Sequence, residues 1–297
     1  MTNIALVSDS SSLASDWDMN ALLKACHSIG LNATVAFWND PYETWDRFDA
    51  AVLRSPWSYI EQPDAFHAWM AFVETRTQLL NPRRVSSWSL HKAYLAELAD
   101  YGVPTVPVRI ITDRNQVEHA LSTIASQNIV VKPAVGANSK DVRRFAKGQP
   151  ALIEHVANLL SRQTDVVVQP YMESIVDCPE TNLTFFNGMF SHAIRKRPLI
   201  GSDGIALEPT QDARSMWIPD DSEIAVASAV VETVATHFDL ASPLLYARVD
   251  LLHNSQGQPI VHELELCEPS LNLQFDRRAP LTFATAIQQR VLVSARP

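Results

Sequence analysis

The chain has 297 residues, enough for about two domains of average size. Apolar residues make up 46% and charged residues 19%, so a chain of this length can bury its own core without disulfides or a structural metal. The 33 acidic residues outnumber the 24 lysines and arginines. The resulting net charge of −9 argues against a general nucleic-acid binder, which needs a cationic face.

Several motif classes are also excluded. The eight glycines form no G-x-G-x-x-G, P-loop or nucleophile-elbow pattern. The three cysteines, Cys26, Cys178 and Cys267, show no C-x-x-C spacing, which argues against a disulfide framework or a zinc site. The first apolar run, Ile4–Val7, is too short for a signal peptide, and no run approaches the roughly 18 apolar residues of a membrane span. We therefore expect a cytoplasmic protein with no membrane partner.

The N-terminal third alternates short apolar runs with helical spacing. Strands are predicted at Ile4–Ser8, Ala33–Trp38 and Ala50–Arg54, and a helix at Met19–Ile29. This β-α-β rhythm predicts a parallel sheet, whose strands present their carboxyl ends to ligands. The loops at those ends carry Asp16 to Asp18 and Arg54, which would be candidates to hold a substrate, and also the aromatic residues Trp57 and Tyr59.

The rest of the chain mixes helices and strands. Helices are predicted at Pro63–Leu80, Val85–Tyr101, Asn115–Ser126, Pro150–Leu160, Ser222–Phe238 and Pro280–Val291. Extended segments are predicted at Thr105–Ile111, Ile129–Pro133, Asp165–Gln169, Tyr246–Leu252 and Ile260–Leu266. Thr181–Lys196 reads as two antiparallel strands that turn at Asn187-Gly188, the strongest hairpin signal in the sequence.

Two lysines stand where they can meet a phosphate. Lys92 lies on a predicted helix, where a solvated surface lysine is the simpler interpretation. Lys132 ends a run of β-branched residues, and the small polar loop Gly136–Lys140 that follows can offer backbone N–H groups to phosphate. A plain surface hairpin is the alternative for that loop.

The segment Val166–Glu173 reads as a strand that stops at Gln169-Pro170. Such a break can act as a hinge between domains, and its backbone would then offer donors and acceptors to a flat base. A strand followed by an ordinary turn is the alternative.

Acidic residues crowd two neighbouring strands near the end of the chain. Arg248 and Asp250 share one face of a strand, and Glu263, Glu265 and Glu268 interrupt an apolar strand where glutamate is uncommon. Their charge must be offset, and a divalent cation such as Mg²⁺ is one way. An ion pair of Arg248 or Arg277 with Glu265 is the alternative, which we rank lower because four carboxylates face few cations. We predict Asp250, Glu265 and Glu268 as metal ligands, with Glu263 in reserve.

In this order, the parts resemble the ATP-grasp superfamily over roughly residues 85 to 295. The resemblance implies that ATP is bound by Lys92 and Lys132, by Ser139 in the small loop, and by the hinge residues Gln169, Pro170, Tyr171 and Met172, with Glu173 near the adenine or ribose. It implies catalytic roles for Arg195, Lys196 and Arg248 and Mg²⁺ at the acidic residues. The chain departs from the family in having one glycine in its phosphate loop and Glu-Leu-Cys-Glu-Pro in place of Glu-x-Asn at the end of the metal motif.

The implied fold is α/β. It comprises an N-terminal pre-ATP-grasp parallel domain at residues 1–84, a linker helix with a small central α+β lid at 85–170, and a C-terminal α+β domain with the metal site at 171–297.

The resemblance also implies a reaction. A substrate carboxylate is activated as an acyl phosphate, with ADP and phosphate as products. Within the superfamily the chain is similar to a compact subgroup that includes cyclo-ligases closing O-ureido-D-serine to D-cycloserine, an antibiotic. The alternatives are a ligase that joins a small amino acid or dipeptide carboxylate to an amine, and an ATP-binding module without catalysis. The expected partners are a small amino-acid-like carboxylate and, as an open alternative, a second copy in a homodimer.

Overall fold

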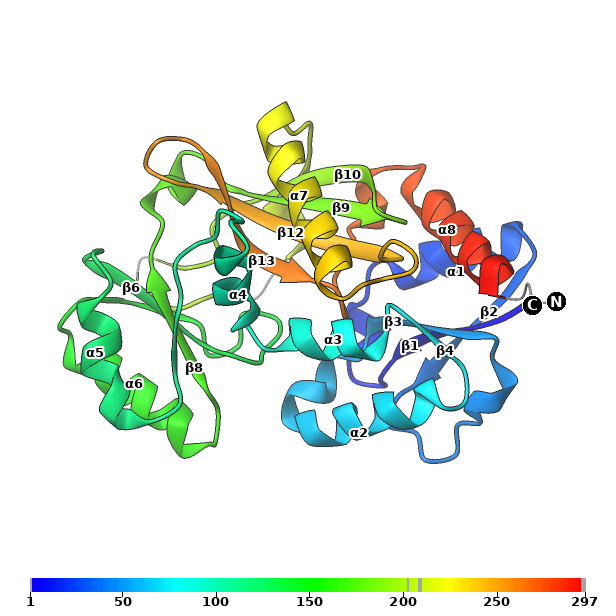
Figure 1. The fold of residues 1–297 in the computed structure, drawn as a ribbon, viewed down its shortest axis with the longest axis horizontal. Helices are drawn as coiled ribbons and strands as arrows, with labels where there is room; N and C mark the ends of the chain where they lie inside the picture. The colour runs from blue at the N-terminus through cyan, green and yellow to red at the C-terminus, as the bar shows by residue number, and fades with distance from the viewer. Residues whose placement is uncertain (1, 202, 208–209, 295–297) are drawn as a thin grey trace.

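The computed structural model describes residues 2–201, 203–207 and 210–294, which form three sheets with helices packed against them. Figure 1 shows the N-terminal sheet at one end of the molecule and a small sheet at the other, with the third sheet between them. Among the described residues, none of the helices combines the length and hydrophobicity that a bilayer crossing requires.

The N-terminal sheet is parallel, as its sequence predicts. It contains β1 (Thr2–Ser8), β2 (Leu31–Phe37), β3 (Ala50–Ser55) and β4 (Gln78–Leu80) in the order β2-β1-β3-β4. Alternate side chains of β1 point to opposite faces. Ile4 and Leu6 pack with α1 (Met19–Ser28) and α8 (Ala279–Ser294), whereas Ala5 and Val7 pack in the cluster that contains α2 (Pro63–Glu74).

Two helices predicted from the sequence end earlier than expected. The helix predicted at Pro63–Leu80 stops at Glu74, because Gln78–Leu80 pairs with β3 and continues the parallel sheet as β4. The helix predicted at Val85–Tyr101 is two helices, α3 (Arg83–Leu90) and α4 (Tyr94–Asp100). Lys92 lies in the break between them, where its backbone N–H donates to the Ala134 carbonyl at 2.9 Å instead of to a helical turn.

The small sheet is antiparallel. It contains β5 (Arg109–Ile111), β6 (Asn128–Pro133), β7 (Arg143–Ala146) and β8 (Val166–Pro170) in the order β5-β8-β6-β7. The helices α5 (Val117–Ser122) and α6 (Pro150–Ser161) bury their apolar faces against it. The strand β7 was not predicted, because its sequence Arg-Arg-Phe-Ala carries little apolar signal and pairing with β6 defines it.

The third sheet is also antiparallel and carries most of the charged residues singled out above. Its strands are β9 (Glu180–Phe186), β10 (Met189–Lys196), β11 (Arg214–Trp217), β12 (Tyr246–His253) and β13 (Pro259–Glu265), in the order β11-β10-β9-β12-β13. The predicted hairpin turn is present, with φ of 46° at Asn187 and 74° at Gly188, as a type I′ turn requires. The helix α7 (Asp221–His237) covers one face of this sheet with an apolar cluster.

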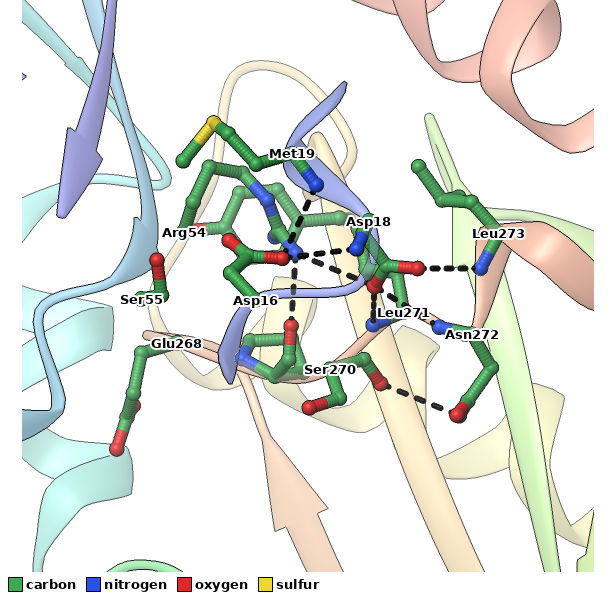
Figure 2. A network of polar contacts seen from close by, with 12 residues as sticks. Asp16, Asp18, Met19, Arg54, Ser55, Glu268, Ser270, Leu271, Asn272 and Leu273 are labelled. Atoms are coloured by element: carbon green, nitrogen blue, oxygen red, sulfur yellow. Dashed lines mark hydrogen bonds and ion pairs between the residues drawn. The ribbon is translucent and has the colours of Figure 1, made fainter. Parts of the chain in front are cut away.

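A buried ionic joint connects the N-terminal sheet to the segment after β13. The Asp18 carboxylate accepts the backbone N–H groups of Leu271, Asn272 and Leu273 at 2.7–3.0 Å. The guanidinium of Arg54, which has no exposed surface, lies 3.7 Å from Asp18 and donates to the Pro269 carbonyl at 2.9 Å (Figure 2).

The joint corrects one expectation from the sequence. Arg54 and the loop Asp16 to Asp18 were candidates to hold a substrate, yet the side chains of Asp16, Asp18 and Arg54 are buried and bonded to the protein itself, and only Trp17 of this set is partly exposed. Asp16 accepts the N–H groups of Asp18 and Met19 at the start of α1. Burial raises the pKa of the Asp18 carboxyl, and the nearby Arg54 opposes that rise only in part. The backbone hydrogen bonds that Asp18 accepts are therefore needed to stabilise its negative charge.

We expect Asp18→Asn to destabilise the protein by about 2 kcal/mol or more, since an amide NH₂ would face backbone N–H donors and Arg54 would lose its carboxylate. Asp100→Asn is the control, because Asp100 is exposed at the end of α4. Urea unfolding of both variants measures the effect. Equal midpoints for Asp18→Asn and the wild type would show that the joint does not hold the fold.

Candidate active site

A cleft lies where the three sheets meet. Its walls include Lys132 from β6, Lys196 from β10, Arg248 from β12 and Glu263 from β13. Trp57 and Tyr59, from the loop after β3, also line it, together with Glu268 and Ser270 from the segment after β13. Residues that are far apart in the sequence and were singled out separately therefore face one space.

Arg248 lies at the centre of the acidic strands. Its Nε and Nη2 donate to the two carboxylate oxygens of Asp250, both at 2.8 Å, and Nη2 also contacts Glu265. Alternation along β12 puts Arg248 and Asp250 on one face, and the register with β13 sets Glu265 directly opposite Arg248. From the sequence, this ion pair ranks below a metal site because four carboxylates face few cations. That reason was wrong, since the ion pair is present and Lys92, Lys132 and Lys196 also line the cleft.

The carboxylates have very different environments. Burial and the neighbouring acidic groups raise the pKa of Glu265 to about 8, against the opposing effect of Arg248. Burial likewise raises the pKa of Asp250, with Arg248 opposing. Burial also pushes up the pKa of Glu263, but Lys92 and Lys132 outweigh it and hold that pKa well below its usual range. Negative charge is therefore concentrated at Glu263 and disfavoured at Glu265.

Three of these carboxylates could share a cation. Asp250, Glu263 and Glu265 each offer an oxygen, and the three oxygens lie within 4.8 Å of one another. Hard oxygen ligands of this kind suit Mg²⁺, and a divalent cation would relieve the repulsion that raises the pKa of Glu265. The structure thus brings together Asp250, Glu265 and the reserve candidate Glu263. It does not place Glu268 in this group, because the Glu268 carboxyl interacts with Tyr59 and Cys267.

The two predicted nucleotide lysines lie side by side in the cleft. The Nζ of Lys92 is 3.1 Å from Glu263 and donates to the Gly136 carbonyl at 3.2 Å, which ties the break between α3 and α4 to the small loop. Lys132 is buried, and burial lowers its pKa to about 8. Within the described ranges, no carboxylate oxygen lies within 4.0 Å of the Lys132 ammonium. A buried cation without a carboxylate partner is well placed to meet an anionic ligand.

The predicted hinge forms an apolar wall of the same cleft. Pro170, Tyr171 and Met172 line it, and Met172 packs with Ile175 against a small cluster that includes Leu252. Gln169 is buried there, and its Oε1 has no hydrogen-bond partner among the described residues. An unpaired acceptor beside an apolar wall suits a flat ring with amino groups. Ser139, in the loop after β6, also lines the cleft.

Two predicted residues do not reach the cleft. Glu173 is exposed in the turn after β8 and accepts a hydrogen bond from the Asn128 Nδ2 at 2.7 Å. Arg195 points to the opposite face of the third sheet, where its guanidinium stacks on Trp217 at 3.5 Å from the ring centroid. The period of two along a strand explains the difference between neighbours, because Lys196 faces the cleft and pairs with Glu180 at 2.8 Å.

Three residues of the cleft were missed from the sequence. Glu180 lies opposite Lys196 in the hairpin register, a pairing that the predicted turn could have revealed. Arg214 lies on β11, a four-residue strand too short to show an alternating apolar pattern, and donates to Asn272 Oδ1 at 2.8 Å. His262 lies beside Lys132, and burial lowers its pKa to about 4, so its neutral ring adds a further polar group to the wall.

Comparison with solved structures identifies the fold. The structure of D-alanine–D-alanine ligase from Bacillus anthracis complexed with ATP matches with a TM-score of 0.69 and 17% identity, over 99% of this chain and 97% of that chain. The ATP-grasp ligase PsnB, complexed with a precursor variant, Mg and ADP, matches with a TM-score of 0.62 and 16% identity, over 98% and 99%. The predicted ATP-grasp fold is thus confirmed.

More similar proteins identify the family. Residues 4–81 match the family described as D-cycloserine synthetase DcsG, N-terminal domain. The cycloserine biosynthesis protein DcsG of Streptomyces lavendulae is 41% identical over 295 residues, which cover 97% of this chain and 98% of that protein. The crystal structure of D-cycloserine synthetase DcsG matches with a TM-score of 0.94 and 40% identity, over 97% of this chain and 99% of that chain. The chain belongs to the D-cycloserine synthetase DcsG family of ATP-dependent ATP-grasp ligases.

Proposed function

We propose that the protein closes O-ureido-D-serine to D-cycloserine, using ATP and Mg²⁺ and releasing ADP and phosphate. The observation that carries the proposal is the juxtaposition in one cleft of a buried lysine that lacks a carboxylate partner, Lys132, with a cluster of three carboxylates. The similarity to the D-cycloserine synthetase DcsG supports the choice of substrate. The proposal includes a cytoplasmic location, where ATP is available.

The nucleotide would occupy the side of the cleft next to the small sheet. In this proposal Gln169 to Met172 hold the adenine, and Lys92, Lys132 and Ser139 hold the phosphates. Asp250, Glu263 and Glu265 would hold Mg²⁺. Bound Mg²⁺ would supply positive charge beside the phosphoryl oxygens.

The substrate would lie between the acidic strands and the N-terminal sheet. Arg214 is suited to hold the substrate carboxylate, because among the described residues no carboxylate oxygen lies within 4.0 Å of its guanidinium. Burial lowers the pKa of Arg214, and the positive charge of the neighbouring Arg248 lowers it further. Two adjacent guanidinium groups repel each other until an anion lies between them. Trp57 and Tyr59 would close this end of the cleft.

The chemistry then follows from the charges. A substrate carboxylate oxygen attacks the γ-phosphorus and ADP leaves, while Arg248 and Lys196 stabilise charge on the transferred phosphoryl group. The oxygen-bound nitrogen of the same molecule attacks the acyl carbon and loses its proton, and the new carbon–nitrogen bond closes the ring as the bond to phosphate breaks. Hydrolysis of the carbamoyl group on that nitrogen, which leaves as carbon dioxide and ammonia, completes the conversion to D-cycloserine. The loop Gly136–Lys140 over the cleft would limit hydrolysis of the acyl phosphate by excluding water.

Ring closure should need one amino-acid substrate only. O-ureido-D-serine alone should trigger ADP release, because an internal nucleophile has an effective concentration of up to roughly 10⁵ M or more when well oriented. A coupled ADP assay with mass spectrometry of the product measures this, and D-serine serves as control. ADP release that requires a second amine would instead identify an intermolecular ligase, and AMP as product would contradict acyl-phosphate chemistry.

Lys132 should contribute to ATP affinity. Lys132→Ala should raise the Kd for ATP more than tenfold, about 1.4 kcal/mol, because a charge-assisted contact to phosphate is lost. Lys24→Ala removes the same charge from the exposed face of α1 and should leave the Kd unchanged. Calorimetric titration of ATP into both folded variants makes the comparison. Unchanged affinity in Lys132→Ala would remove Lys132 from the site.

Glu265 should serve metal binding at the expense of stability. The pKa of Glu265 in the folded protein is about 8, above its ordinary value of 4.5, so the folded state binds this proton more tightly than the unfolded state does. Without Mg²⁺, the free energy of unfolding should therefore fall as the pH rises from about 5 to 8. Glu265→Gln should weaken this decline yet raise the Mg²⁺ concentration needed for turnover at least tenfold. Thermal unfolding at several pH values and a Mg²⁺ titration of ADP release measure the two effects.

The exposed Glu232→Gln on α7 is the matched control for both measurements. Wild-type Mg²⁺ dependence in Glu265→Gln would exclude Glu265 from the metal site.

A further inference from the structure

A second polar cluster lies on the face of the third sheet that points away from the cleft. It contains a partly exposed cysteine, Cys178, whose Sγ is 3.1 Å from Nδ1 of His253, and Nη2 of Arg195 donates to the same sulfur at 3.4 Å. Cys178 precedes β9, His253 ends β12 and Arg195 lies on β10, so the sheet brings together residues up to 75 positions apart.

Glu223 completes the cluster from the first turn of α7. Its Oε1 lies 3.9 Å from Nε2 of His253 and accepts a hydrogen bond from Thr181 at 2.7 Å. A carboxylate on that side favours the proton on Nε2, which leaves Nδ1 free to accept the thiol proton. A nucleophile and a base are therefore in contact, with a guanidinium beside the sulfur and the Glu223 carboxylate near the far nitrogen of the ring at a distance longer than a hydrogen bond.

We propose that Cys178 is a nucleophilic thiol and a modification site that reacts with peroxides. His253 takes the thiol proton, and Arg195 stabilises the thiolate. The sulfur attacks one peroxide oxygen, an S–O bond forms and the O–O bond breaks, and the departing hydroxide leaves as water after taking the proton held by His253. With hydrogen peroxide the sum is thiol plus H₂O₂ giving sulfenic acid plus water, with sulfur oxidised and peroxide reduced.

The other two cysteines provide an internal comparison. Cys26 is buried in the cluster between the N-terminal sheet and its helices, and burial raises its pKa to about 12. Cys267 is buried as well, and burial raises the pKa of its thiol well above the usual value. By contrast, Cys178 is only partly buried and follows the exposed residues Val176 and Asp177.

The first test uses iodoacetamide on the native full-length protein at pH 6.5, where an unassisted thiol is about 1% thiolate. Peptide mapping by mass spectrometry should show carbamidomethylation of Cys178 at least tenfold faster than that of N-acetylcysteine, with Cys26 and Cys267 unlabelled. A rate no faster than that of N-acetylcysteine, or equal labelling of all three cysteines, would overturn the proposal.

Variants separate the base from simple exposure. His253→Asn keeps a polar atom near Nδ1 but cannot take a proton, and it should slow alkylation of Cys178 at least fivefold. His119→Asn, at an exposed histidine of α5, should not change the rate. If circular dichroism shows His253→Asn to be unfolded, Arg195→Gln replaces it and should also slow the reaction. An unchanged alkylation rate in the folded variant would contradict the role of the cluster. Asp220 and Glu223, both from the start of α7, are the other charged groups near His253.

The last arm treats the protein with hydrogen peroxide and traps sulfenic acid with dimedone. A dimedone adduct on Cys178, absent from Cys178→Ser, is expected. Alkylation by iodoacetamide without a dimedone adduct would overturn the oxidation step. None of these measurements uses turnover, so their outcome is independent of the proposed ligase reaction.

Discussion

The buried pairing of Arg54 with Asp18 is the contact on which the geometry of the cleft depends. Asp18 holds three successive backbone N–H groups of the segment after β13, and Arg54 holds a carbonyl of the same segment. That segment carries Glu268 and Ser270 into the cleft, while the loop after β3 brings Trp57, whose Nε1 donates to the Glu268 carbonyl at 3.0 Å. Hydrogen bonds of this kind offset the cost of a charge pair in the interior, although Nε of Arg54 has no hydrogen-bond partner among the described residues. The joint therefore fixes the N-terminal sheet in one position against the acidic strands.

Within the cleft, charge is arranged for ligands rather than for the empty protein. Arg248 is fully engaged by Asp250 and Glu265, and Lys92 and Lys196 each hold one carboxylate. Burial instead lowers the pKa of the Lys132 ammonium and raises the pKa of the Glu265 carboxyl. Both shifts cost folding free energy, and a bound anion and a bound cation would each reverse one of them. Such perturbed groups of opposite sign in one cleft are typical of sites that hold a nucleotide with its metal.

The sequence predicted those parts of the fold whose signal is local. Short apolar runs identified β1, β12 and β13, and Asn187-Gly188 identified the hairpin, because composition and turn chemistry act over a few residues. The strands β4, β7 and β11 were missed because pairing with a neighbour, and not their own residues, makes them strands. Lys92 was expected to lie on a helix and to reach a nucleotide. In the structure it lies at a break between two helices, where its backbone N–H bonds to the Ala134 carbonyl. Arg54 was expected to hold a substrate because its partner Asp18 lies on another loop, and the sequence around Arg54 does not indicate that contact.

The position of α8 has a consequence for how the chain is made. The N-terminal sheet buries one face against α1 and α8, where Phe283 and Ile287 pack with Ile4 and Leu6. During synthesis the first strands leave the ribosome long before α8 does, at about 5–20 residues per second. For that interval Ile4 and Leu6 lack their contacts with α8, and an apolar face with parallel strands is open to other chains. The N-terminal sheet is thus first in the sequence but among the last parts to reach its native packing.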